Sequence, residues 1–240
     1  LNHIDLDFCS KKSIKIISLN DLRKYIKNVN STAELTMSLM LSLNRSIVKA
    51  NNKIKIKREW SRYPYITDST ESKTVGILGM GRIGKKVANY CKVLGFKVIF
   101  YDKKKINISK KYNRVSLNVL LKTADIISIH INFNENNINF FDSKKINSLK
   151  KDCIIINTAR GEIIDEYYLI KQIKKFNIRG YACDVIANEN IPKCRNNFLK
   201  YIKNIDNVIV TPHIGGFTRQ SLNYTENLIA NHFKKILINE

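Results

Sequence analysis

A glycine-rich turn at residues 79–84 has the residue types and the spacing that bind a diphosphate. An apolar run at 74–78 leads directly into Gly79-Met80-Gly81-Arg82-Ile83-Gly84, and a helical pattern follows. The first glycine permits a tight turn, the second lets a pyrophosphate approach the backbone, and the third lets the helix pack closely on the strand. Because the free N–H groups and the dipole of a helix start favour an anion, this turn predicts a dinucleotide site.

An acidic residue, Asp102, follows a second apolar run at 97–101 and lies 18 residues after Gly84. At that spacing its carboxylate can accept hydrogen bonds from the adenosine ribose hydroxyls. A carboxylate there repels a 2′-phosphate, so the sequence favours NAD over NADP as the cofactor. Three lysines follow at 103–105 and would offset part of that repulsion, although we interpret them as a solvated charge run.

An alternation of strand and helix patterns from Lys73 to about residue 212 positions these groups. Helical patterns lie at 82–94, where Gly95 ends the helix, and from Asp165 to Phe176. Strands that alternate with helices predict an α/β fold with a doubly wound parallel sheet of the Rossmann type. The expected strands are 74–78, 97–101, 126–130, 153–157, 180–185 and 207–211.

The segment before this alternation has patterns of its own. Residues 14–19 are typical of a short strand, and Ser31 with Glu34 forms a capping box ahead of the apolar stretch Leu35 to Val48. We expect that stretch to be a buried or interface helix. The polar residues 51–72, which include the only tryptophan, are expected to form a connecting arm.

The composition is that of a globular protein with a sizeable core. Hydrophobic residues make up 44% of the 240 residues, enough for one large α/β domain or for one domain with part of a second. The sequence has no run of 18 apolar residues that would predict a membrane span, and its first residues do not form a signal peptide. The five cysteines are widely spread and form no CxxC pair, so we expect reduced thiols, no metal site and a cytoplasmic protein.

The formal net charge of +22 raises the question of a nucleic-acid partner, whose phosphates such a charge would neutralise. The lysines, however, are scattered through every segment and mixed with asparagine and isoleucine, as an AT-rich coding sequence would produce. No aromatic and basic motif of a nucleic-acid module accompanies them. We therefore do not expect a nucleic-acid partner, and we expect the summed field to attract small anionic molecules.

Four motifs occur in a fixed order along the chain. The glycine turn at 79–84 is followed by Ile156-Asn157-Thr158-Ala159-Arg160-Gly161, by Cys183-Asp184-Val185 and by Thr211-Pro212-His213-Ile214-Gly215-Gly216. In order and spacing this set resembles the D-isomer-specific 2-hydroxyacid dehydrogenases, among them phosphoglycerate, D-lactate and glyoxylate/hydroxypyruvate enzymes. The resemblance implies an oxidoreductase that transfers a hydride between NAD(H) and a D-2-hydroxy acid or its 2-oxo acid. A phosphoglycerate-like substrate is slightly favoured over lactate and glyoxylate or hydroxypyruvate.

The resemblance implies three catalytic residues, Arg160, Glu189 and His213. His213 would protonate the ketone oxygen, or take the hydroxyl proton in the reverse direction, and Glu189 would pair with its ring and orient it. The guanidinium fork of Arg160 would bind the carboxylate and carbonyl oxygens of a 2-oxo acid. Glu162 and Glu166 are expected to cap the following helix and not to partner the histidine.

The resemblance also implies the contacts to the cofactor. Arg82 and Ile83 would lie at the pyrophosphate. Thr158 and Ala159 would lie near the nicotinamide ribose, and Asp184 at the carboxamide. The full predicted set is Gly79, Gly81, Arg82, Ile83, Gly84, Asp102, Thr158, Ala159, Arg160, Asp184, His213, Gly215 and Gly216.

The chain departs from the family pattern after Glu189. A proline commonly follows this glutamate in the family, whereas Asn190 and Ile191 precede Pro192 here, and a shift of the loop register would misplace the carboxylate. An amide at this position would indicate a formate dehydrogenase, which Glu189 disfavours. A dinucleotide-sensing transcriptional corepressor, which shares the fold and even the catalytic residues, stays open as an alternative function.

The resemblance further implies the domain organisation. Residues 1–20 would be the C-terminal part of a truncated substrate-binding domain, residues 21–216 an NAD-binding Rossmann domain with a dimerisation helix and arm, and residues 217–240 a helix that returns to the substrate-binding domain. The first residue is Leu1 and not methionine, so we expect a fragment of a longer protein. The helix at 35–48 and the arm with Trp60 predict a homodimer.

Overall fold

The computed structural model describes residues 4–19, 21–106 and 111–239. The chain divides into two compact units, one of residues Asn30–Gly215 and one of Leu1–Val29 with Gly216–Glu240. Residues 21–29 group with the smaller unit, whereas the resemblance implies that they belong to the Rossmann domain. Of the predicted end segments, residues 1–3, 20 and 240 lie outside the described residues.

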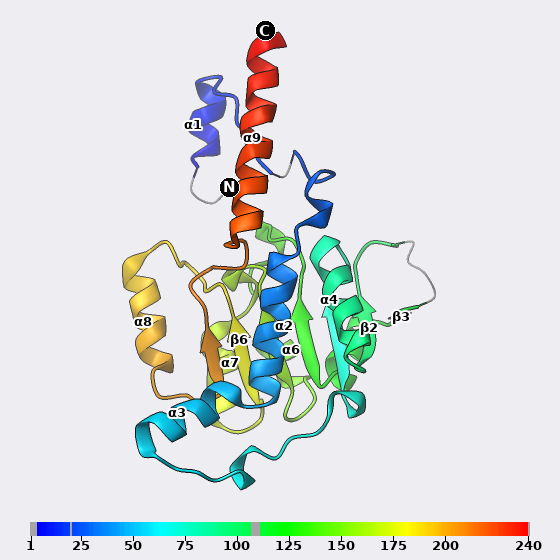
Figure 1. Cartoon of the computed structure of the whole chain (residues 1–240), viewed down its shortest axis with the longest axis vertical. Coiled ribbons are helices and arrows are strands. Elements are labelled where there is room, and N and C mark those ends of the chain that lie inside the picture. Colours follow the sequence, from blue (N-terminus) through cyan, green and yellow to red (C-terminus); the bar gives the residue numbers. More distant parts are fainter. Residues whose placement is uncertain (1–3, 20, 107–110, 240) are drawn as a thin grey trace. The chain divides into compact units, whose positions relative to one another are not determined.

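In the larger unit, the described residues form one seven-stranded sheet whose neighbouring strands are all parallel (Figure 1). The strands, in spatial order, are β3 (Asn113–Arg114), β2 (Lys97–Tyr101), β1 (Thr74–Leu78), β4 (Ile126–Ile129), β5 (Ile154–Asn157), β6 (Gly180–Cys183) and β7 (Val208–Val210). From β1 the chain builds the sheet first to one side and then to the other, so the predicted doubly wound fold is confirmed. Three strands end earlier than predicted, which leaves His130, Asp184 and Thr211 just beyond the carboxyl edge of the sheet.

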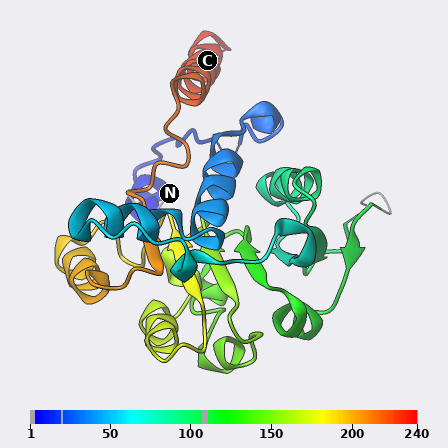
Figure 2. The ribbon, with the colours of Figure 1, turned by 60° about the horizontal axis from the view of Figure 1, so that its bottom comes forward.

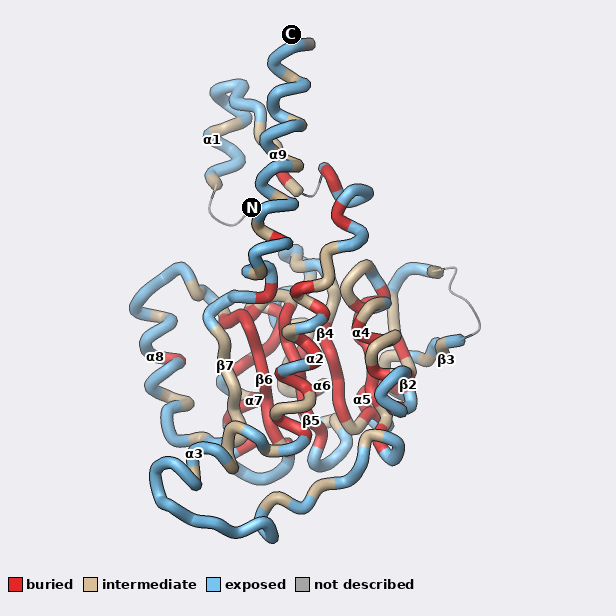
Figure 3. The backbone as a smooth tube through the Cα atoms, viewed as in Figure 1, coloured by how far each residue is buried: buried red, intermediate tan, exposed pale blue. Residues whose placement is uncertain are grey.

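Helices cover both faces of this sheet (Figure 2). They are α2 (Ser31–Asn44), α4 (Arg82–Val93), α5 (Leu117–Thr123), α6 (Ser143–Asn147), α7 (Glu166–Lys174) and α8 (Pro192–Ile202). Side chains alternate along each strand, so that Ile127 and Ile155 pack into a core with α5 to α8, while Ile126 and Ile154 pack into a core with α2 and α4. Figure 3 shows the central strands buried along their length. Burial on both faces explains the continuous apolar runs of these strands.

The helix predicted at 35–48 is in fact two helices. α2 ends at Asn44, Ser46 adopts a φ of +54°, and α3 (Ile47–Lys57) follows (Figure 1). The predicted capping box is wrong, because α2 begins at Ser31 itself and its N-cap is Asn30. The side chain of Asn30 makes no cap bond to the helix, since its oxygen accepts a hydrogen bond from Lys86 Nζ.

The connecting arm begins later than predicted, after α3, and contains 3-10 turns at Tyr63–Tyr65 and Thr70–Ser72. Trp60 lies on this arm and is 89% exposed. The arm and α3 lie at the end of the sheet where the strands begin (Figure 1). They are therefore at the edge opposite to the strand ends that carry the predicted site residues.

The smaller unit consists, in its described residues, of α1 (Leu6–Lys11), a 3-10 turn (Ile26–Asn28) and α9 (Arg219–Asn239). The predicted strand at 14–19 is wrong, and Ser18 instead donates its N–H and its hydroxyl to Asp21 Oδ2, at 3.0 and 2.9 Å. A strand requires a neighbour for its backbone hydrogen bonds, and the described part of this unit offers none. No helix in the described part of the chain is long and apolar enough to cross a membrane.

Candidate active site

The glycine turn connects β1 to α4, and its three glycines meet different surroundings. Gly79 has a φ of +91°, and a Cβ there would lie 2.8 Å from the backbone of His130. A Cβ on Gly84 would lie 2.1 Å from the carbonyl oxygen of Gly79. A Cβ on Gly81 would meet nothing within 4 Å. The protein's own packing requires the first and third glycines, whereas the second leaves open the space that a diphosphate would take, so the turn fits a dinucleotide.

Two further groups shape this turn. Asp102, just after β2, accepts hydrogen bonds from the N–H of Met80 at 2.8 Å and from the N–H of Lys104 at 2.9 Å, so its carboxylate lies against the glycine turn. The side chains of lysines 103–105 are exposed, as the charge-run interpretation predicts. Arg82 is the first residue of α4, and partial burial lowers the pKa of its guanidinium. An anion at this helix start would offset the cost of burying that positive charge.

The sheet register brings the predicted catalytic segments to one edge. Asn157 at the end of β5 pairs with Cys183 at the end of β6, and Cys183 pairs with Val210 at the end of β7. The three strands therefore end at the same level. Arg160 follows β5 by three residues, Asp184 follows β6 directly, and His213 follows β7 by three residues. They come from three neighbouring loops at the carboxyl edge, where ligands bind to such sheets.

The loop that carries His213 is held by one buried carboxylate. Asp184 is 2% exposed and accepts hydrogen bonds from Thr211 Oγ1 at 2.5 Å, from the N–H of Ile214 at 2.8 Å and from the N–H of Gly215 at 2.7 Å. These donors lie on both sides of His213, which adopts a φ of +55°. That left-handed conformation costs a residue with a Cβ about 1–2 kcal/mol, and the three bonds to Asp184 offset it.

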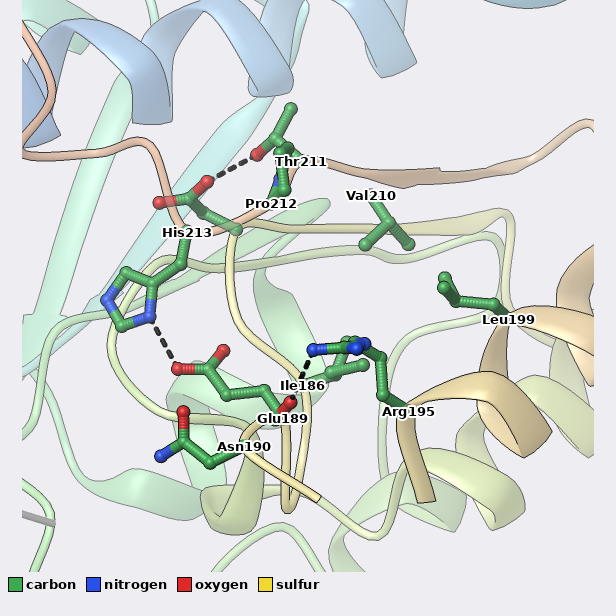
Figure 4. Close-up of a pocket in the computed structure, with 10 residues that line it drawn as sticks. Ile186, Glu189, Asn190, Arg195, Leu199, Val210, Thr211, Pro212 and His213 are labelled. Carbon is green, nitrogen blue, oxygen red and sulfur yellow. Dashed lines mark hydrogen bonds and ion pairs between the residues drawn. The ribbon is translucent and has the colours of Figure 1, made fainter. Parts of the chain in front are cut away.

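His213 and Glu189 form a close pair despite the altered sequence after the glutamate (Figure 4). His213 Nδ1 lies 2.5 Å from Glu189 Oε1, and the two side chains are 45% and 26% exposed. With Nδ1 engaged by the carboxylate, Nε2 is the ring nitrogen that can exchange a proton with a substrate. The pair lines a cavity of about 370 Å³ together with residues that include Leu199 and Val210. The arrangement is that of a general acid–base with an orienting carboxylate.

The loop that carries Arg160 is shaped by the side chain of Asn157. Its oxygen accepts the N–H of Ala159 at 3.0 Å, and its amide donates to the carbonyl of Arg160 at 2.9 Å. The loop packs so closely on the next one that a Cβ on Gly161 would lie 2.0 Å from the backbone carbon of Ile186. Arg160 Nη1 donates to the carbonyl of Ala159 at 2.7 Å, which uses one of the five guanidinium N–H groups.

A chain of threonine hydroxyls joins these loops to the start of α2. Thr36 Oγ1 donates to the carbonyl of Thr32 at 2.7 Å and lies 2.9 Å from Thr158 Oγ1, so Thr158 is the donor in that buried contact. Thr32 Oγ1 donates to the carbonyl of Gly215 at 3.1 Å. The residue patterns gave no sign that α2 contributes to this edge, because the threonines act across more than 100 residues of sequence.

The expectation that Glu162 and Glu166 cap the next helix is wrong. The N-cap of α7 is Asp165, which accepts the N–H of Tyr168 at 3.0 Å. Glu162, in the 3-10 turn Gly161–Ile163, accepts the N–H of Asn188 at 3.2 Å. Glu166 is 4% exposed, and its burial raises the pKa of its carboxyl to about 7. Both glutamates therefore act on the loop of Glu189.

The remaining predicted contacts stay predictions. Thr158 and Ala159 lie in the Arg160 loop, and Ile83 lies in the first turn of α4, as their motifs require. Both carboxylate oxygens of Asp184 already accept hydrogen bonds from the protein, so a contact with a carboxamide would add to that role. Gly215 belongs to the loop of His213, whereas Gly216 belongs to the smaller unit.

Known proteins of one family are similar to this chain. The family model for the "D-isomer specific 2-hydroxyacid dehydrogenase, NAD binding domain" matches residues 37–215. A D-3-phosphoglycerate dehydrogenase of Methanocaldococcus jannaschii is 34% identical over 244 aligned residues, which cover 100% of this chain and 44% of the relative. A hydroxypyruvate reductase of Thermotoga maritima is 31% identical over 92% of this chain and 69% of the relative.

A solved structure also matches the whole chain. The D-lactate dehydrogenase of Aquifex aeolicus, complexed with NAD and lactic acid, superposes with a TM-score of 0.88 at 28% identity, over 100% of this chain and 74% of that one. The chain spans less than half the length of the archaeal relative. The match to the family model covers well over half of the residues. The chain therefore belongs to the D-isomer specific 2-hydroxyacid dehydrogenase family and carries that family's NAD-binding domain.

Proposed function

We propose that the protein transfers a hydride between NAD(H) and a D-2-hydroxy acid or its 2-oxo acid. The observation that carries the proposal is the His213–Glu189 pair, whose side chains lie 2.5 Å apart. The pair lies at the carboxyl edge of the sheet, where the Arg160 loop and the open glycine turn also begin. We assign to this edge an acid–base group, a guanidinium and a dinucleotide cradle. A dehydrogenase that acts on 2-oxo acids requires these three.

Each residue has one task in the proposed reduction. Arg160 binds the carboxylate and the carbonyl oxygen of the 2-oxo acid, which orients the substrate and polarises its carbonyl. His213 gives the proton at Nε2 to the carbonyl oxygen, and Glu189 holds the ring at Nδ1 and stabilises it while it is charged. The bound nicotinamide supplies the hydride chemistry. The same groups run in reverse for oxidation of the hydroxy acid.

A phosphoglycerate-like substrate is our first choice over lactate and glyoxylate or hydroxypyruvate. The relatives described above carry the names of enzymes for three of these substrates, so membership of the family does not select one. The net charge of +22 favours the substrate that bears a phosphate, because the summed positive field raises the local concentration of a multiply charged anion.

The test is a panel of 2-oxo acids incubated with NADH, followed by the loss of NADH absorbance. We expect turnover by the parent, and its loss in His213→Ala and Arg160→Ala while NADH binding, measured by fluorescence, is retained. His232→Ala is the matched control, since His232 lies on α9 outside the proposed machinery. Turnover by His213→Ala at near the parent rate would refute the assignment of the proton donor.

We also propose that a second copy of the chain binds α3 and the arm. This surface exposes four large apolar side chains, Ile56 at 78%, Trp60 at 89%, Tyr63 at 74% and Ile66 at 80%. Such a cluster on one surface is typical of an interface. Light scattering should give twice the chain mass for the parent and for Phe176→Asp, whose exposed aromatic ring lies outside the arm. Trp60→Asp should shift the mass towards a monomer, and a monomeric parent would exclude the dimer.

A further inference from the structure

Glu166 is a buried acid that touches none of the predicted catalytic side chains. It is the first residue of α7 and is 4% exposed. Its Oε1 accepts a hydrogen bond from Tyr181 Oη of β6 at 3.0 Å, and its Oε2 accepts the N–H of Ala187 at 2.9 Å. The carboxylate thus connects the interior of the sheet to a loop backbone two residues before Glu189.

That loop contains no strand, and its backbone depends on side-chain acceptors. Glu162 Oε1 accepts the N–H of Asn188 at 3.2 Å, next to the bond from Ala187 to Glu166. Asn188 itself adopts a φ of +55°, a conformation that local hydrogen bonds must hold. Two carboxylates from the segment after Arg160 therefore set the course of the backbone that leads into Glu189.

The position of this backbone matters because the contact between Glu189 and His213 is short. Glu189 Oε1 reaches to 2.5 Å from His213 Nδ1, so a displacement of the loop by about 1 Å would break the hydrogen bond. We propose that Glu166 is a positioning residue for the reaction proposed above: its buried carboxylate fixes the backbone at Ala187 and thereby sets the contact between Glu189 and His213. The inference rests on the proposed function for its effect on turnover, and on the structure alone for its effect on the loop.

A purely structural role would not explain why an acid lies here. A leucine would fill a similar volume without desolvating a carboxyl group, and the negative groups Glu162 and Glu189 make the position less favourable still. Burial first, and then these two carboxylates, raise the pKa of Glu166 to about 7, while the bonds from Ala187 and Tyr181 lower it. What an acid offers and leucine does not is an acceptor for the N–H of Ala187.

Because Glu166 titrates, the strength of its hydrogen bond with the loop backbone depends on pH. The titratable groups that face Glu166 are Tyr181 and Cys183 from β6, Glu162 from the 3-10 turn, and Glu189 from the loop itself. A bond from an N–H to an ionised carboxylate is stronger than one to a neutral acid. The hydrogen bond from the N–H of Ala187 to Glu166 therefore becomes stronger as the pH rises through about 7.

The experiment compares Glu166→Ala and Glu166→Gln with Asp125→Ala as the matched control. Asp125 also accepts a backbone N–H, that of Thr74 at 2.7 Å, but it lies before β4 at the opposite edge of the sheet. Two quantities are measured on the full chain: the hydrogen-exchange protection of the Ala187 amide between pH 6 and 8, and kcat and KM in the 2-oxo acid assay. The hydrogen-exchange measurement needs neither cofactor nor substrate.

We expect Glu166→Ala to lower the protection of Ala187 by about tenfold or more, and to lower kcat by about 10- to 100-fold with little change in the KM for NADH. Glu166→Gln keeps an oxygen for the N–H of Ala187, so it should restore most of the protection and of kcat while abolishing the rise of protection between pH 6 and 8. Asp125→Ala should leave the Ala187 amide unchanged. If Glu166→Ala does not fold, Glu166→Asp replaces it, because the shorter acid keeps the charge but loses reach.

Protection of Ala187 within twofold of the parent in Glu166→Ala or Glu166→Asp would overturn the proposal. So would an equal loss of kcat in Asp125→Ala, since that loss would reflect general destabilisation. A parent that turns over none of the 2-oxo acids would refute the proposed function and not the hold on the loop, because the exchange of the Ala187 amide still shows whether Glu166 fixes it.

Discussion

Replacing Glu166 by glutamine should change how the stability of the protein depends on pH. The pKa of Glu166 is raised from 4.5 to about 7 in the folded protein, with burial as the largest cause. Between these values the folded state binds more protons than the unfolded state, so stability falls as the pH rises. The contribution of the protonated acid is fully present below pH 4.5 and is lost as the pH rises through 7. Glutamine does not titrate and removes this dependence.

The size of the effect follows from the shift. The rise of the pKa from 4.5 to about 7, at about 1.4 kcal/mol per pH unit, corresponds to roughly 3–4 kcal/mol, of which about 3 kcal/mol is lost between pH 4.5 and pH 9. At 4% exposure the side chain is little screened by solvent. The free energy of unfolding of the parent, minus that of Glu166→Gln, should therefore fall by about 3 kcal/mol over this range. All other titrating groups are common to both proteins and cancel in the difference.

Urea unfolding followed by circular dichroism, at pH steps from 5 to 9, measures this difference. The fluorescence of Trp60 is unsuitable, because the residue is 89% exposed on the arm and changes its surroundings little on unfolding. A difference that stays constant within about 0.5 kcal/mol from pH 5 to 9 would show that Glu166 does not titrate there, and the argument from burial would be wrong.

Three further outcomes are expected. Burial lowers the pKa of His130 to about 3, so the stability that the neutral imidazole contributes is present above pH 6.5 and is lost as the pH falls. His130→Gln should therefore reduce the loss of stability at pH 5 by up to about 2 kcal/mol in the same unfolding assay. Gly81→Ala should leave the melting temperature unchanged but weaken NADH binding by about tenfold or more. Gly84→Ala, whose Cβ would lie 2.1 Å from a carbonyl oxygen, should instead destabilise the folded protein by about 3 kcal/mol. Asp184→Asn keeps one acceptor oxygen but places an amide nitrogen against the N–H of either Ile214 or Gly215, so it should cost about 2 kcal/mol and lower kcat, measured by melting and turnover.

The parallel doubly wound sheet could be predicted because six of its strands are largely apolar runs, whereas the edge strand β3 consists of Asn113 and Arg114 and was not predicted. Runs such as 126–130 and 153–157 are buried on both faces, and burial of that kind leaves a strong signal in sequence. The wrong predictions concern segments without such a signal. The strand expected at 14–19 has no partner strand in the described part of its unit, and the capping box failed because α2 begins one residue earlier than that pattern predicts, with Asn30 as its N-cap.

The candidate site could be predicted as residue types but not as geometry. Two of the motifs contain Arg160 and His213, and the resemblance implies Glu189 between them. The structure brings Glu189 and His213 together although the residues after the glutamate depart from the family pattern. Nothing in the sequence indicates that Thr36 reaches Thr158, 122 residues away, or that Glu166 faces β6 and not the helix that it begins. Such contacts depend on the packed positions of whole elements, which local patterns do not encode.

Two buried carboxylates explain how irregular loops hold the short contact between His213 and Glu189. Asp184 accepts hydrogen bonds from backbone N–H groups near His213, and Glu166 accepts one from a backbone N–H near Glu189. A buried carboxylate therefore fixes the backbone near each partner of the 2.5 Å contact. Because these braces act on backbone N–H groups, they do not depend on the side chains of Ala187 or Ile214. Those two positions should therefore accept a change of side chain, whereas Asp184 and Glu166 should not accept the loss of a carboxylate oxygen that holds the backbone. The short contact thus depends on two buried acids that accept hydrogen bonds from loop backbones.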